Sequence, residues 1–197
     1  MSIFTQYLKV GKSPKFKQPG SVEARTWYRE KARAVNTINT IGVMRREYLN
    51  NKTMIKLGYM YLFGYDPKTK EDLPYYDRFP LIFPIQLYGD GFLGINMHYL
   101  PYDYRAKLMD ALYTLSTSRM YNEKTKLRLT YDILNGASKY KYFKPCVKRY
   151  LYSHVRTKFM MVPSDEWDVA LFLPLESFAK RNKSFVQRES RAIINGV

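Results

Sequence analysis

The chain has few of the residues that cross-links, metal centres and membrane spans require. It contains one cysteine, Cys146, among 197 residues, so no disulfide can form within it and synthesis in a reducing compartment is expected. Its two histidines, His98 and His154, do not make up the roughly three or four ligands of a zinc site. No apolar run approaches the roughly 18 residues of a spanning helix, and no secretory signal pattern is present. These shortages disfavour a disulfide-stabilised secreted protein, a zinc protein and a membrane protein.

Acidic residues are the next shortage. The chain has 33 Lys and Arg against 17 Asp and Glu, which gives a formal net charge of +16. The segment from Ile133 to Ser164 contains no acid at all, and its tyrosines are Tyr140, Tyr142, Tyr150 and Tyr152. Its basic residues, which we predict to bind a polyanion, are Lys139, Lys141, Lys144, Lys148, Arg149, Arg156 and Lys158. Nucleic acid is favoured over an anionic membrane as the partner, and a merely solvated basic face is the plainer alternative.

Catalytic motifs are also missing from the sequence. There is no glycine-rich phosphate loop, no dinucleotide-binding fingerprint and no nucleophile elbow. Cys146 stands in a basic setting that could lower the pKa of its thiol, but no motif supplies a partnering base. We therefore predict a protein that is not an enzyme and that carries no cofactor or metal ion.

Four carboxylates are candidate ligands for Mg²⁺. Glu71, Asp72, Asp77 and Asp90 all fall in segments that the sequence predicts to be turns, where Asp is common for local hydrogen-bonding reasons. Turn chemistry is favoured, and a small nuclease using Asp77 with Asp90 or Asp72 stays open as the weaker alternative. His98 is interpreted as a satisfied histidine of the sheet.

The first 20 residues are predicted to form an extended basic arm. They contain Pro14, Pro19 and Gly20 but no acid, and the lysines that could make contacts are Lys9, Lys12, Lys15 and Lys17. Such a segment buries little surface and becomes ordered on binding. It is either a frayed terminus or an arm that lies on a neighbouring subunit or on nucleic acid.

Residues 21–197 are predicted to form a single α+β domain. Helix is expected over 21–57, beginning at the cap Ser21, and a small aromatic antiparallel sheet or partly closed barrel over 58–100. Strands are expected at 59–63, 81–87 and 92–99, with a tight turn at 89–91. Residues 101–197 are expected to be mainly helical, with helices at 102–116, 127–135, 146–155 and 184–194 and a strand at 158–162.

The predicted helix at 146–155 determines how the basic segment is interpreted. Val147, Leu151 and Val155 are spaced four apart and would form its buried stripe. Lys148, Tyr152 and Arg156 have the same spacing on another face. A helix would therefore project basic and aromatic groups together from one surface.

Several phrases of the sequence resemble proteins of T4-like contractile-tailed bacteriophages. They include GYMYLFGYDPKTKEDLPYYDRFPLIFPI, GDGFLGINMHYLPYDYRAKLMDAL, KPCVKRYLYSHVRTKF and DEWDVALFLPLESF, and they extend over roughly residues 58–178. Members of that group are described as virion structural proteins, and some as DNA-end protectors. The resemblance implies a particle component of the neck, tail or baseplate, made in the host cytoplasm and assembled with other virion proteins, with a homo-oligomeric ring as the expected form. The alternative is a free DNA-binding or DNA-end-protecting protein.

Overall fold

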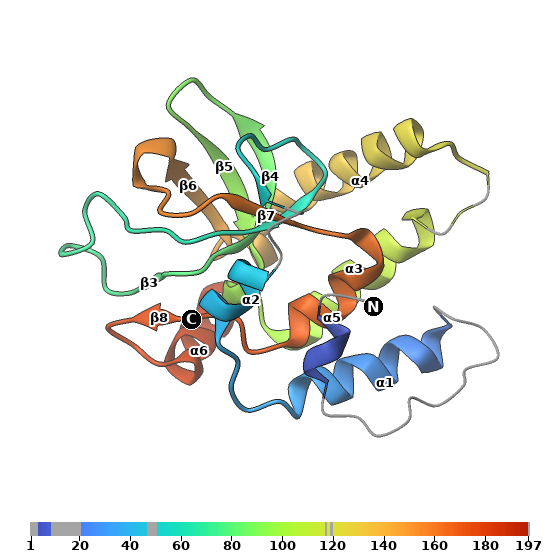
Figure 1. The fold of residues 1–197 in the computed structure, drawn as a ribbon, viewed down its shortest axis with the longest axis horizontal. Helices are drawn as coiled ribbons and strands as arrows, with labels where there is room; N and C mark the ends of the chain where they lie inside the picture. Colours follow the sequence, from blue (N-terminus) through green and yellow to red (C-terminus); the bar gives the residue numbers. More distant parts are fainter. Residues whose placement is uncertain (1–3, 9–20, 47–50, 117, 119, 197) are drawn as a thin grey trace.

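A curled six-stranded antiparallel sheet lies beside a group of helices (Figure 1). The computed structural model describes residues 4–8, 21–46, 51–116, 118 and 120–196. The strands are β1 (Asn51–Lys52), β2 (Met60–Leu62), β3 (Tyr76–Asp77), β4 (Leu81–Leu87), β5 (Gly91–Asn96), β6 (Val147–Leu151), β7 (Phe159–Val162) and β8 (Phe178–Ala179). The helices are α1 (Val22–Arg33), α2 (Thr40–Arg46), α3 (Tyr102–Ser116), α4 (Glu123–Ser138), α5 (Trp167–Phe172) and α6 (Lys183–Asn195). Short 3-10 turns are η1 (Thr5–Tyr7), η3 (Met97–Tyr99), η4 (Lys141–Phe143), η5 (Tyr152–His154) and η6 (Ser164–Glu166).

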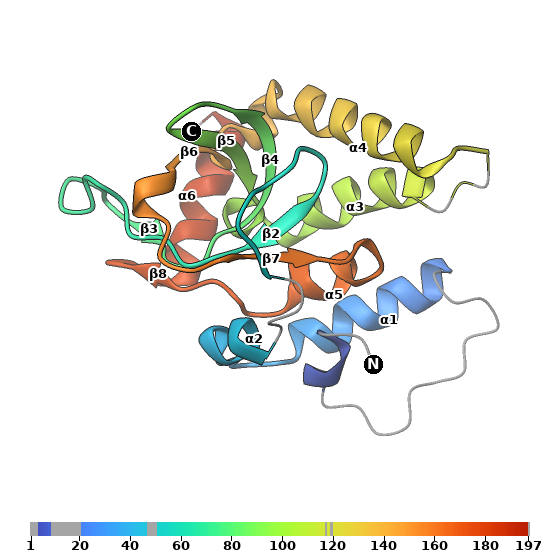
Figure 2. The same ribbon diagram turned by 45° about the horizontal axis from the view of Figure 1, so that its top comes forward.

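The strand order of the sheet is β1-β7-β2-β4-β5-β6, and every neighbouring pair is antiparallel. Strands β3 and β8 form a separate two-stranded ribbon. Because β1 and β6 are the outer strands, the sheet is open, so of the two predicted forms the antiparallel sheet is confirmed and the barrel is not. Helices α3 and α4 pack side by side, and α1 lies against α5 (Figure 2).

Alternation along β2 separates two hydrophobic cores. Met60 and Leu62 point toward the helices and belong to the larger core, whereas Tyr61 and Phe63 point to the opposite face. The smaller core is mostly aromatic, and its buried members are Ile55, Tyr61, Phe63, Tyr65, Ile82, Phe92, Tyr150 and Phe159. We call this set the aromatic core. It lies on the face of the sheet opposite the larger core, and none of its buried members among the described residues belongs to a helix.

Several predicted boundaries are confirmed because their signals are local. Ser21 caps α1 by accepting a hydrogen bond from the Ala24 N–H at 3.2 Å. Strand β4 and helix α3 have the predicted bounds, and β7 lies within the predicted strand at 158–162. Helix α6 ends at Gly196, which has a left-handed φ of 77°.

The helix predicted at 146–155 is wrong. Residues Val147–Leu151 form β6, which pairs along its length with β5, and a 3-10 turn follows at Tyr152–His154. Val147 packs against the larger core while Tyr150 belongs to the aromatic core, so the true period is two rather than four. Pairing with a distant strand outweighed the helical spacing of the apolar residues.

Other predicted boundaries also differ from those of the structure. The predicted strand at 92–99 ends at Asn96, whose side chain accepts a hydrogen bond from the His98 N–H and starts the η3 turn. Helix α4 continues through Gly136 to Ser138. The predicted helical region 21–57 is divided into α1, α2 and β1, and the predicted mainly helical region 101–197 contributes β6 and β7 to the sheet.

The beginning of the predicted arm is built into the fold. Phe4 and Leu8 are buried in the larger core, and the Phe4 N–H donates to the Glu166 carboxylate at 3.3 Å. Residues 4–8 are therefore not an extended arm. Lys9, Lys12, Lys15 and Lys17 lie outside the described residues.

Several arginines bind carboxylates or backbone carbonyls of the fold. The Arg29 Nε–H donates to Asp168 at 2.8 Å and its terminal nitrogen donates to Asp110 at 2.9 Å, which connects α1 with α5 and α3. Arg25 also pairs with Asp110. Arg105 is fully buried and donates to three backbone carbonyls, among them that of Leu171 at 2.6 Å. Part of the positive charge is therefore structural.

Gly91 permits the close approach of β5 and β6. A Cβ atom at this position would lie 2.0 Å from the Tyr150 carbonyl oxygen, far inside van der Waals contact. The neighbouring turn residue Gly89 has nothing within 4 Å of the corresponding position. The end of the β4–β5 hairpin can therefore pair with β6 only if residue 91 has no side chain.

We predict that Gly91→Ala lowers the free energy of unfolding by about 3 kcal/mol, because the added methyl group separates two paired strands. Gly89→Ala, in the same turn, should change it by less than about 0.5 kcal/mol. Equilibrium denaturation in urea measures both. Equal stability of the two variants would show that β5 and β6 are not paired at Gly91.

Candidate nucleic-acid interface

The seven predicted polyanion-binding residues occupy three places in the fold. Lys139, Lys141 and Lys144 are exposed at the end of α4 and around η4. Lys148 and Arg149 are neighbours on β6, and Arg156 and Lys158 lie on the exposed loop before β7. They do not form one helical face, because the predicted helix is a strand.

The two basic residues of β6 are engaged within the protein. Lys148 is half-buried, its ammonium lies 4.5 Å from the centre of the Tyr99 ring, and burial lowers its pKa. Arg149, on the opposite face of the strand, forms an ion pair with Asp90, and its guanidinium lies 4.1 Å from the centre of the Tyr88 ring. Lys148 in particular is poorly placed to meet an external polyanion.

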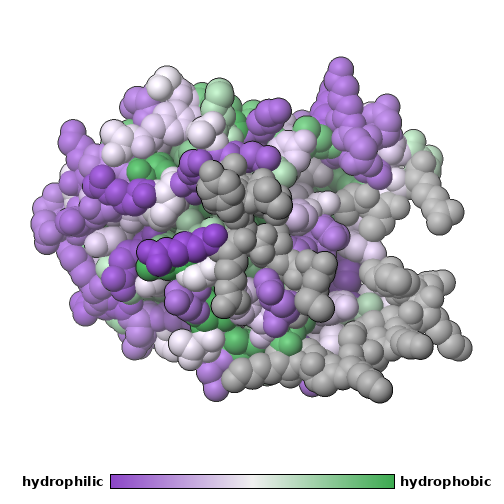
Figure 3. All heavy atoms as spheres, viewed as in Figure 1, coloured by the Kyte–Doolittle hydropathy of each residue, from purple (hydrophilic) through white to green (hydrophobic). Residues whose placement is uncertain are grey.

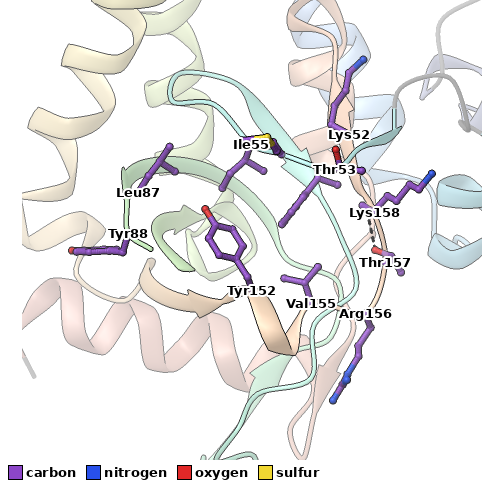
Figure 4. A pocket seen from close by; sticks show the side chains of 12 residues that line it. Lys52, Thr53, Ile55, Leu87, Tyr88, Tyr152, Val155, Arg156, Thr157 and Lys158 are labelled. Carbon is purple, nitrogen blue, oxygen red and sulfur yellow. Dashed lines mark hydrogen bonds between the residues drawn. The ribbon is translucent and has the colours of Figure 1, made fainter. Parts of the chain in front are cut away.

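The loop of Arg156 and Lys158 borders a groove of about 790 Å³, which we call the tyrosine groove. Its lining residues are Lys52, Thr53, Met54, Ile55, Leu87, Tyr88, Tyr152, Val155, Arg156, Thr157, Lys158 and Phe159. None of them is acidic. Figure 4 shows the basic side chains on one side of the groove, with Leu87, Tyr88 and Tyr152 on the other. The groove therefore offers positive charge and a flat apolar surface together.

The aromatic core forms the floor of the tyrosine groove. Ile55 and Phe159 belong to both, and the Tyr152 ring at the mouth lies 5.6 Å from the ring of Phe92 below it. Phe63 lies deeper, with its ring 5.0 Å from that of Phe159 and 5.8 Å from that of Phe92. Because the Phe63 ring packs edge to face against those of Phe92 and Phe159, the floor is preformed.

A second groove of about 610 Å³ lies on the other side of the same loop. The two grooves share Arg156, Thr157 and Lys158, which we call the basic wall. Arg45 and Arg78 line the second groove together with Ile41, Met44, Tyr76 and Phe79 among others. Hydrophobic surface on this side of the molecule lies in hollows between hydrophilic side chains (Figure 3). Basic side chains thus continue from the first groove to the second, whose lining also includes one acid, Asp66.

The basic wall is held in place by backbone and side-chain hydrogen bonds. The Arg156 N–H donates to the Gly64 carbonyl at 2.8 Å, and the Gly64 N–H donates to the Thr157 hydroxyl at 2.8 Å. Asp66 accepts from Arg156 at 3.1 Å and also pairs with Lys70, at 3.2 Å. These contacts fasten the loop to the end of β2 and orient its side chains.

Sequence reasoning found part of this site. Tyr152, Arg156 and Lys158 were among the residues singled out, whereas Lys52 and Tyr88 were missed because they come from distant segments of the chain. Tyr150, one of the four tyrosines of the acid-free segment, is buried in the aromatic core. Tyr140 and Tyr142 are exposed but lie next to α3 and α4, away from the basic wall.

The carboxylates do not assemble into a metal centre in the part of the chain that the structure describes, which has no group of three or more potential ligands. Asp90 pairs with Arg149 on the surface. Asp77 is the last residue of β3 and is buried, and its carboxylate makes the local hydrogen bond expected of a turn residue. It accepts hydrogen bonds from the Phe79 and Ser177 N–H groups at 3.1 and 3.2 Å, and its other oxygen lies 2.6 Å from Nδ1 of His98.

The buried pair of Asp77 and His98 joins the β3–β8 ribbon to the sheet. Burial by itself would raise the pKa of the Asp77 carboxyl, but the imidazole and the two backbone donors outweigh it and hold the pKa below its usual value. His98 is fully buried in η3, beyond the end of β5. The other histidine, His154, lies with Nδ1 2.9 Å from the Asp66 carbonyl, which supports the basic wall.

We predict that Asp77→Asn costs about 3 kcal/mol of stability at neutral pH, because it removes a buried carboxylate that contacts His98 and accepts two backbone hydrogen bonds. A lowered carboxyl pKa adds stability above pH ~4, and this stability is lost as the pH falls through the folded-state value. The free energy of unfolding, measured by urea denaturation between pH 7 and pH 2, should therefore decrease less with falling pH in the variant than in the parent. Asp72→Asn, in an exposed turn, is the control, and equal acid profiles of both variants and the parent would contradict the assignment.

Cys146 is buried, and its basic setting does not lower the pKa of its thiol. Burial raises the pKa of its thiol to about 12, and the attraction of Arg105 and Lys148 does not compensate. A thiol in this state is protonated at neutral pH and cannot act as a nucleophile.

We predict that iodoacetamide does not modify Cys146 in the folded protein at pH 7.5 and modifies it readily in concentrated urea. Intact-mass spectrometry counts the added groups. Rapid labelling under native conditions, with the circular dichroism spectrum of the folded protein retained, would contradict the burial of this side chain.

Comparison with known proteins agrees with this arrangement. The model of the family described as Phage T4 terminal DNA protecting protein matches residues 25–192, which include both grooves. The chain belongs to this family. Neither a curated protein nor a solved structure matches it significantly. Among the described residues, no helix combines the length and the apolar character that crossing a bilayer requires.

Proposed function

We propose that this protein binds the end of a linear DNA molecule through the tyrosine groove and the basic wall, and covers that end. The observation that carries the proposal is a groove lined by Lys52, Arg156 and Lys158 with no acid among its lining residues. Membership in a family described by terminal DNA protection names the partner. The positive charge and the family thus point to the same ligand.

The chemistry of the groove suits DNA better than it suits other polyanions. Ammonium and guanidinium groups attract phosphate in a way that depends on salt and not on sequence. The exposed parts of Tyr88 and Tyr152 provide apolar contact surface that a phosphate backbone alone does not use. A partner with both phosphates and accessible base faces uses both features, and a DNA end is such a partner.

The protein acts in this proposal by binding and not by catalysis. Protection requires that an enzyme be kept from the terminal nucleotides, which occupancy alone achieves. Asp77 and Cys146, the groups that a hydrolytic or nucleophilic mechanism would use, are buried and engaged in the fold. Binding strength, and not turnover, is therefore the property to measure.

The resemblance to virion proteins extends the proposal to the particle. We propose that the protein is a virion component placed where packaged DNA ends, in the neck, tail or baseplate region, in contact with neighbouring subunits in a ring. A groove of about 630 Å³ between α3 and the end of α4, lined partly by Tyr140 and Tyr142, is the surface proposed for such a neighbour. Lys139, Lys141 and Lys144 beside it would meet an acidic subunit or a second stretch of DNA, and the lysines of residues 9–17 would extend the contact.

Exonuclease protection tests the proposal. We expect the purified protein to protect linear duplex DNA from a processive exonuclease, and a closed circular DNA to compete weakly because it has no end. Replacing both Arg156 and Lys158 by Gln removes two cations from the basic wall. We expect affinity to fall about tenfold at moderate salt, and the slope of log affinity against log salt to decrease by about 2.

Lys124→Gln with Arg128→Gln is the matched control, since it removes the same charge from α4, and neither residue lines the tyrosine groove or the second groove. Its affinity should stay within about twofold of the parent. Equal losses in the two double variants would mean that net charge alone attracts DNA. Equal competition by circular and linear DNA would contradict recognition of an end.

A further inference from the structure

We infer that the tyrosine groove receives an unpaired nucleotide at the DNA terminus, with its base lying on Tyr152 and its phosphate on the basic wall. This inference rests on the proposed function and specifies the form of the ligand. A blunt duplex and a duplex with a single-stranded extension both have ends. The shape and lining of the tyrosine groove favour the extended one.

The shape of the site is the first argument. The groove is a hollow of about 790 Å³ and not a broad convex surface, which places it in the usual size range of small-ligand pockets, about 300–1,000 Å³. The side of a duplex presents phosphates and groove edges, and its base faces are covered by stacking. An unpaired nucleotide can leave the stack and enter a hollow of this size.

The character of the floor is the second argument. Ile55 and Phe159 are almost completely buried beneath the groove, while Tyr152 is 37% exposed and Leu87 is 43% exposed at its sides. Such a surface gains nothing from phosphate, which would have to lose water without compensation. A flat base gains stacking and apolar contact there, and because every base has such a face the contact tolerates any sequence.

The arrangement of charge is the third argument. The basic wall lies along one side of the hollow, across from Tyr152, and the charged ends of Arg156 and Lys158 are at the outer edge of that side, directed away from the ring (Figure 4). In a nucleotide, phosphate and base are also at opposite ends of the sugar. Thr157 is hydrogen-bonded to Gly64, and Tyr152 packs on Phe92, so the two sides of the hollow are supported separately. The site is built for a ligand with one charged and one flat aromatic end.

The experiment compares three DNA molecules that differ only at their ends. One is blunt, one carries a short 3′ extension and one a short 5′ extension, and each has 2-aminopurine at the terminal position of one strand. We expect one of the extended molecules to bind about tenfold more tightly than the blunt one, in line with the stacking of a single base. Its fluorescence should fall on binding, because 2-aminopurine is quenched when it stacks on an aromatic ring.

Two substitutions at Tyr152 separate stacking from packing. Tyr152→Phe keeps the ring and should keep the preference for the extended end. Tyr152→Leu retains apolar contact with Phe92 but lacks the flat face, so we expect its preference for the extended end over the blunt end to fall to within about twofold. Circular dichroism and urea denaturation show whether each variant is folded.

The outcomes distinguish the two proposals. If the protein binds none of the three molecules better than circular DNA, the proposed function fails. If it binds blunt and extended ends equally, with no change of fluorescence in the wild-type protein, this inference is overturned while end recognition stands. The fluorescence of the wild-type complex decides the question even if Tyr152→Leu does not fold.

Discussion

Packing of aromatic rings around Phe63 is the interaction on which the site depends. Its ring contacts those of Tyr65, Phe92, Tyr150 and Phe159 at centroid distances of 5.0 to 6.2 Å. Phe92 lies in β5, Tyr150 in β6 and Phe159 in β7, while Phe63 and Tyr65 follow the end of β2. The cluster therefore holds these strands together. No helix of the described residues contributes a buried side chain to this cluster, and the tyrosine groove opens above it.

Positive charge has two different uses in this protein. Arg25, Arg29 and Arg105 satisfy carboxylates and carbonyls inside the fold, where they position helices. Arg156 and Lys158 are exposed on a loop whose backbone is fixed to Gly64. A rigid loop loses little conformational entropy when a ligand binds, so the basic wall retains more of its attraction for phosphate than a disordered lysine tail would. Net charge alone does not make this distinction.

Local signals made the helices predictable, and nonlocal pairing explains what was missed. The cap at Ser21, the proline before α3 and Gly196 each act within one helical turn, so α1, α3 and the end of α6 follow from sequence. Strand β6 carries apolar residues four apart and was assigned to a helix, because only its pairing with β5 reveals the strand. The acid-free composition of 133–164 predicted a binding surface, but the helix error placed it wrongly. Lys52 and Tyr88 line the tyrosine groove because of the order of the strands in the sheet, and residue spacing along the sequence does not reveal that order.

The most direct test of the central claim is photocrosslinking from a photoreactive nucleotide at the extreme terminus of a linear DNA, followed by peptide mass spectrometry. The account predicts crosslinks in the peptides that contain residues 52–55, 87–88 and 152–158, and their loss when the photoreactive group is moved well inside the duplex. Crosslinks confined to residues 139–144, or equally strong from terminal and internal positions, would contradict it. The DNA end would then lie somewhere other than the mouth of the aromatic core.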